Sequence, residues 1–64
     1  MFLHKHRIWD EKHGVFHTVV FCTGERDIVV EVVKLLQDEE YVVINDKSDI
    51  DNNVYHVVME RVGE

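Results

Sequence analysis

Residues 23–37, TGERDIVVEVVKLLQ, decide the fold, because they are the one run in the chain that is long and periodic enough for a helix. Polar side chains recur every three or four positions along it, at Asp27, Glu31 and Lys34, and apolar side chains fill a wide opposite face. Thr23 is the expected N-cap, because its hydroxyl can accept a hydrogen bond from a free amide of the first turn. The β-branched run IVVEVV also suits a strand, but the length and the polar stripe favour a helix.

Segments with the composition of β-strands lie on both sides of this helix. Before it, residues 2–9 and 15–22 are rich in β-branched and aromatic side chains, and Gly14 between them suits a turn with a positive φ. After it, residues 41–45 and 54–62 have the same character and enclose an acidic, Asn-rich loop. The order ββαββ predicts an α+β fold of two layers, with one helix packed on a mostly antiparallel four-stranded sheet.

The length and composition of the chain bound its architecture. Its 64 residues predict a single domain over 1–64, and a chain of this size buries only about 60% of its unfolded surface, so its stability is marginal without support. The lone cysteine, Cys22, allows no disulfide and fits a reducing cytoplasm. The sequence contains no leader peptide and no run of 18 apolar residues, so we expect a cytoplasmic protein that does not bind a membrane.

The predicted strands carry apolar side chains on both faces. In residues 2–9, alternation places Phe2 and Ile8 on one side of the strand and Leu3 and Trp9 on the other. Strands of this kind occur where both faces of a sheet are covered. Since the helix covers one face, we expect a second subunit in a homodimer, or a partner protein, to cover the other.

Three of the five histidines are candidate metal ligands. His4 and His6 share one side of the first strand. His17 joins them if paired positions of the hairpin sum to an odd number, as when Asp10 lies opposite Val15, and it lies on the other face if the sum is even. Three imidazoles around an open position are the ligands of a catalytic zinc. Zn²⁺ is therefore the one cofactor that the sequence suggests, and hydrogen-bonding or interface histidines with no cofactor are the main expectation.

The acidic side chains are concentrated in the second part of the chain. The net charge is −6, and residues 25–64 hold eleven acidic side chains against four basic ones. Many of these acids bracket the third predicted strand, where they could attract a basic surface on another protein, mainly by speeding the encounter. Tyrosines beside them would anchor the partner. The expected contact residues are Asp38, Glu39, Glu40, Tyr41, Asp46, Asp49, Asp51 and Tyr55.

Nucleic-acid binding and catalysis are both disfavoured. Lys5, Arg7 and Trp9 form a basic and aromatic stripe suited to phosphates and bases, but the net charge repels a polyanion. Cys22 stands before the predicted helix, and Arg26 lies four residues after Cys22. The segment CTGER that joins them is too short for the phosphate loop of a cysteine phosphatase. The sequence holds no Ser–His–Asp pattern and no phosphate-binding glycine loop. We therefore do not expect an enzyme.

These patterns predict a small acidic module that binds another protein. We expect a regulator or inhibitor of a larger protein that handles nucleic acid, of the kind that a phage encodes. Two alternatives stay open. One is a zinc-binding protein built on His4, His6 and His17, and the other is a structural homodimer whose acidic side chains only solvate its surface.

Overall fold

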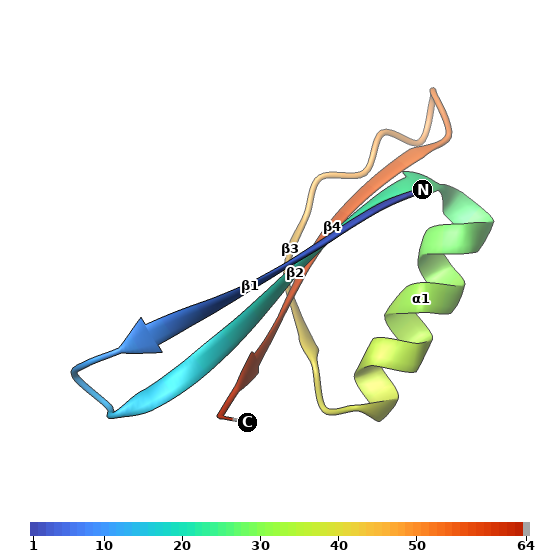
Figure 1. The fold of residues 1–64 in the computed structure, drawn as a ribbon. Helices are drawn as coiled ribbons and strands as arrows, with labels where there is room; N and C mark the ends of the chain where they lie inside the picture. The colour runs from blue at the N-terminus through green and yellow to red at the C-terminus, as the bar shows by residue number, and fades with distance from the viewer. Residues whose placement is uncertain (64) are drawn as a thin grey trace.

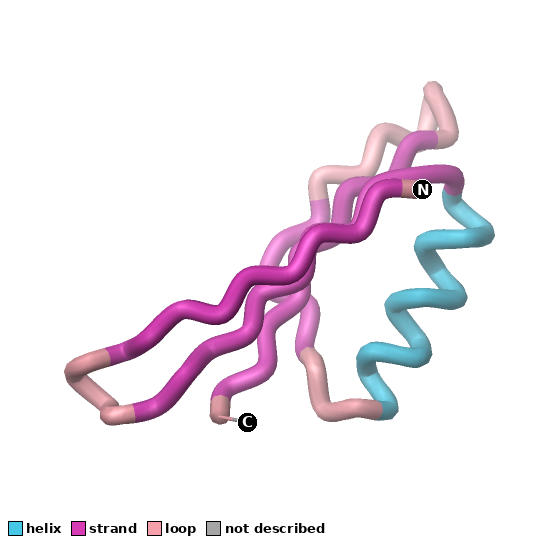
Figure 2. The backbone as a smooth tube through the Cα atoms, viewed as in Figure 1, coloured by secondary structure: helices cyan, strands magenta, loops and turns pink. Residues whose placement is uncertain are grey.

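The chain folds into two layers in the predicted order ββαββ (Figures 1 and 2). The structure is a computed structural model, and it describes residues 1–63. All four strands form one antiparallel sheet in the order β1-β2-β4-β3, and the helix lies across one face. The predicted α+β fold is confirmed. The elements are β1 Phe2–Asp10, β2 Val15–Glu25, α1 Arg26–Asp38, β3 Val42–Asp46 and β4 Val54–Val62.

The last strand of the chain occupies the middle of the sheet. β4 pairs antiparallel with both β2 and β3, so β2 and β3 run in the same direction with β4 inserted between them, as in a split βαβ unit. β1 and β3 are therefore the two edge strands. The helix packs mainly on β2 and β4, and the β1–β2 hairpin extends away from it (Figure 1).

The hairpin adopts the odd-sum register. Asp10 lies opposite Val15, and the four residues between them form a turn that closes with a 2.8 Å hydrogen bond from the Gly14 amide to the Asp10 carbonyl. Gly14 has a φ of +65°, which confirms the expected positive φ and explains why a glycine suits this position.

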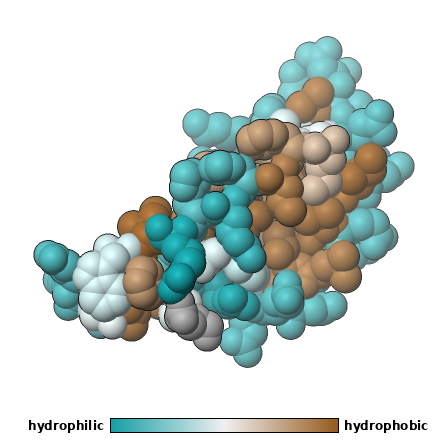
Figure 3. Space-filling model, viewed as in Figure 1, coloured by the Kyte–Doolittle hydropathy of each residue, from teal (hydrophilic) through white to brown (hydrophobic). Residues whose placement is uncertain are grey.

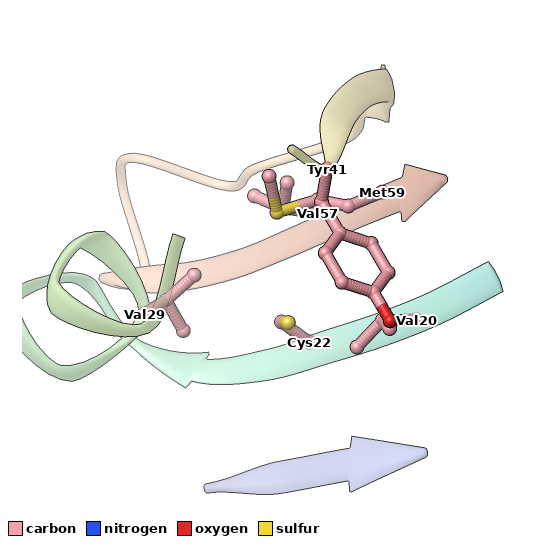
Figure 4. Packing of buried hydrophobic residues seen from close by; sticks show 6 residues of the cluster. All are labelled: Val20, Cys22, Val29, Tyr41, Val57 and Met59. Atoms are coloured by element: carbon pink, nitrogen blue, oxygen red, sulfur yellow. The ribbon is translucent and has the colours of Figure 1, made fainter. Parts of the chain in front are cut away.

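A small core fills the space between the sheet and the helix. Val20 lies opposite Met59 and Cys22 lies opposite Val57, so the two central strands present a continuous apolar floor toward the helix. Val29 is the one helix residue that is fully buried among those described. Figure 4 shows the six buried members of this cluster, which are Val20, Cys22, Val29, Tyr41, Val57 and Met59.

The N-cap of the helix lies two residues later than predicted. β2 continues through Glu25, because Thr23 pairs with His56 and Gly24 with Tyr55 in the neighbouring strand. The Thr23 hydroxyl shares a 3.2 Å hydrogen bond with His56 Nδ1, so Thr23 is not the N-cap, and Glu25 takes that position without a side-chain cap bond. Pairing with β4 therefore keeps Thr23 in the strand and prevents it from capping the helix, as the local sequence favours.

The sheet covers only part of the apolar face of α1. Ile28 and Leu35 are 46% and 63% exposed, because the helix rests on the central strands and both side chains lie outside the contact. Figure 3 shows hydrophobic side chains gathered at the surface on the side of the molecule where the helix lies. The wide apolar face expected from the sequence is therefore only partly explained by the core.

The C-terminus of α1 ends in a reversal that buries Tyr41. The Tyr41 amide donates to the Leu36 carbonyl at 3.0 Å, and the Glu40 amide donates to the Gln37 carbonyl at 3.1 Å, which is the bond pattern of a Schellman motif. Glu40 has a φ of +72° in the position that glycine usually takes. Arg61 of β4 donates from Nη1 to the Glu39 carbonyl at 3.1 Å, so a cation offsets the acids at this end.

We predict that Glu40→Gly stabilises the fold by about 1 kcal/mol, because glycine adopts the left-handed conformation without the steric penalty that a Cβ imposes. Chemical unfolding measures the change. Glu39→Gly is the matched control: it removes the same charge one residue earlier, where φ is −95°, and it should not stabilise. Equal stabilisation by both variants would show that charge, not backbone strain, is responsible.

Candidate functional site

The face of the sheet opposite α1, called the open face here, has no second layer over it within residues 1–63. Its large apolar side chains are exposed on every strand, for example Phe2 at 60%, Val42 at 59% and Val62 at 61%. The strand registers and the two-residue alternation of side chains define its members. They are Phe2, His4, His6, Ile8, Asp10, Val15, His17, Val19, Phe21, Thr23, Glu25, Val42, Asn45, Val54, His56, Val58, Glu60 and Val62.

The three candidate zinc ligands share the open face but do not form one cluster. The odd-sum register puts His4, His6 and His17 on the same side. The Nε2 atoms of His4 and His6 lie 2.7 Å apart, whereas both ring nitrogens of His17 face carboxylates. Among residues 1–63, no group of three or more His, Cys, Asp or Glu side chains is arranged to hold a metal ion. The zinc site stays a prediction without geometric support.

His17 belongs instead to a network with two carboxylates. Its Nε2 lies 3.0 Å from Asp10 Oδ2 and its Nδ1 lies 3.3 Å from Glu60 Oε2, and Asp10 also contacts His13 Nδ1 at 2.8 Å. The hydrogen bond to Asp10 is the main reason that the pKa of His17 is raised, and the bond to His13 is the main reason that the pKa of Asp10 is lowered. Sequence reasoning missed Glu60, because its proximity depends on the register between β2 and β4.

We predict that His17→Gln destabilises the protein more at pH 5.5 than at pH 8.5. A raised folded-state pKa gives stability that is complete below the unfolded value of about 6.5 and is lost as the pH rises through the folded value. Urea unfolding of both proteins at each pH measures the difference. In an Asp10→Asn background the pH dependence of the His17→Gln effect should shrink, and an effect of the same size at both pH values would contradict the ion pair.

Neither predicted tyrosine anchor is displayed as a free ring. Tyr41 is 3% exposed and belongs to the core, so the expectation that it anchors a partner is corrected. The Schellman reversal places it there, and Arg61 covers its ring with the guanidinium carbon 4.6 Å from the ring centroid. Tyr55 is half-buried against the same core cluster, on the helix side of the sheet.

The predicted acidic residues lie along the β3 edge but form two groups. Asp38, Glu39 and Glu40 precede β3, and Asp46, Asp49 and Asp51 end it or follow it, so a whole strand separates them (Figure 1). Both groups are exposed. We call the six together the acidic margin.

Two members of the acidic margin also organise the loop after β3. Asp46 Oδ1 accepts a 3.1 Å hydrogen bond from the Ser48 amide, and Asp49 Oδ2 accepts a 2.7 Å bond from Asn52 Nδ2. The bond from Asn52 is the main reason that the pKa of Asp49 is lowered. The remaining acids, at the end of α1 and at Asp51, are the ones that a partner meets without disturbing the loop.

Cys22 lies in the core and not at a reactive surface. It is 1% exposed, and burial raises the pKa of its thiol, which disfavours the thiolate that acts as a nucleophile. Its position opposite Val57 makes it a small apolar member of the core floor.

Comparison with protein-family models, with curated proteins and with solved structures finds no match for this chain. Within residues 1–63, no helix is both long enough and apolar enough to cross a membrane. The geometry of the open face and of the acidic margin is therefore the basis for a functional proposal.

Proposed function

We propose that this chain is a cytoplasmic, non-catalytic module that regulates or inhibits another protein by binding it through the open face. The observation that supports the proposal is the exposure of large apolar side chains from every strand on one side of the sheet. Large apolar side chains exposed together on one face mark interaction sites in small soluble proteins. The partner would offer a matching apolar patch.

The open face has the dimensions of a small protein interface. Nine paired positions along β2 and four strands across give a footprint of about 30 by 15 Å at the usual strand spacings. This area of about 450 Å² is a little over half of the roughly 800 Å² that one partner contributes to a standard interface. Full burial of a Phe, Ile or Val side chain contributes about 1.5–3 kcal/mol, so Phe2, Ile8, Phe21 and Val62 are the expected anchors.

Charge favours a basic protein over a second copy as the occupant. The acidic margin borders the open face along the β3 edge, and a partner with basic residues around its apolar patch would be attracted to it. Two copies, each with a charge of −6, would repel one another. On the face itself the carboxylates Asp10 and Glu60 are engaged by His17, so binding there leaves no carboxylate of this network unpaired.

We predict that Phe21→Asp weakens binding to the partner by at least about tenfold, because it removes an apolar anchor from the centre of the open face. Leu35→Asp is the matched control: it adds the same charge on the outer side of α1, where the leucine is 63% exposed. The experiment selects proteins that bind to the wild type and to Leu35→Asp but not to Phe21→Asp. Each such protein would be purified, and its affinity for the wild type and for both variants would be measured directly. Equal loss with both variants would contradict the open face as the docking surface.

The roles of the acids and of self-association are tested with the same proteins. Replacing Glu39 and Glu40 with glutamine should slow association at low salt, while Glu31→Gln on α1 should not. Light scattering of the chain alone should give the 7.6 kDa monomer. A dimer that Phe21→Asp dissociates would make a second copy the occupant, and the structural homodimer would replace the proposed module.

A further inference from the structure

The edge strand β1 carries a close pair of histidines. His4 and His6 lie two residues apart on this strand, and both are exposed. Their Nε2 atoms lie 2.7 Å apart. Among residues 1–63, neither ring forms an ion pair with a carboxylate, whereas His17 contacts two carboxylates. The pair is therefore separate from the His17 network.

Aromatic side chains of β1 and β2 flank the two imidazole rings. The His4 ring is stacked on Phe2, with 6.0 Å between the ring centroids and 16° between the ring planes. The His6 ring meets Phe21 edge-on, with 6.1 Å between the centroids, and Phe21 lies opposite His4 in the hairpin. These contacts restrict the rotation of both imidazoles, so the two nitrogens are held near each other before a ligand binds.

The spacing of the two rings matches that of two imidazoles bound to one metal ion at adjacent positions. Nitrogens that lie about 2.0 Å from an ion and at a right angle to each other are about 2.8 Å apart, and the centroids of their rings are about 4.5 Å apart. For His4 and His6 these two separations are 2.7 Å and 4.2 Å. In a tetrahedral site the nitrogens would be about 3.3 Å apart, so the geometry favours an ion that accepts ligands at right angles over Zn²⁺.

We propose that His4 and His6 together chelate one Cu²⁺ ion, with water in its remaining positions. Cu²⁺ prefers tetragonal sites with nitrogen and oxygen ligands, and it binds a given site more tightly than the other divalent ions of its row. Coordination through both Nε2 atoms requires that the proton of each neutral ring lies on Nδ1, which solvent reaches because both side chains are exposed. The site does not rest on the proposed function, because both ligands belong to one strand of this chain.

Titration of the chain with Cu²⁺ tests the proposal. Isothermal titration calorimetry should show a tightest class of one ion per chain. His4→Gln and His6→Gln should each weaken this class by at least about tenfold, because the second ligand acts at a high effective concentration. His13→Gln is the matched control: it removes an exposed histidine from the β1–β2 turn, and it should leave the affinity unchanged. Unfolding midpoints without copper confirm that each variant is folded.

NMR of the wild type supplies a test that needs no variant. Cu²⁺ is paramagnetic and broadens the signals of nearby nuclei, so less than one equivalent of the ion shows which site fills first. We expect the ring signals of His4 and His6 to broaden before those of His13. The proposal is wrong if all five histidines broaden together, if either His4→Gln or His6→Gln keeps the wild-type affinity, or if His13→Gln weakens binding as much as they do.

Discussion

The pairing of β2 with β4 is the interaction on which the rest of the structure depends. It places Val20 opposite Met59 and Cys22 opposite Val57, and this floor is where Val29 packs. It also puts the last strand in the middle of the sheet, which makes β1 and β3 edges. One helix of 13 residues then covers the centre of one face only. The exposed open face and the uncovered helix side of β1 both follow from that geometry.

The two sides of the sheet have different chemistry because alternation sorts the residues of each strand. On β1, the histidines and Phe2 project to the open face, whereas Lys5 and Arg7 project to the helix side. The six residues of the acidic margin lie around β3, at the opposite edge of the sheet. The open face and the acidic margin are thus separate surfaces on one small chain.

Local patterns in the sequence were sufficient to predict the order of elements, the glycine turn and the bounds of β4, whereas long-range pairing decided the rest. Thr23 has the side chain of an N-cap, but its pairing with His56 keeps it in β2. Tyr41 looks like a surface anchor between charged and apolar neighbours, but the reversal at Glu40 turns it into the core. Glu60 meets His17 only through a register set by strands that are far apart in the sequence. Local patterns therefore suggest candidate residues, but they do not show which neighbours strand pairing brings to each of them.

The central claim is that α1 covers one face of the sheet and leaves the other open to solvent. NMR of the isolated chain with a soluble paramagnetic agent tests it most directly, because methyl signals at exposed positions broaden. We predict strong broadening at Ile8 and Val62, which are 53% and 61% exposed, and little at Val29 and Met59, which are buried. Equal protection of all four residues would contradict the account, since it would mean that the second face is already covered.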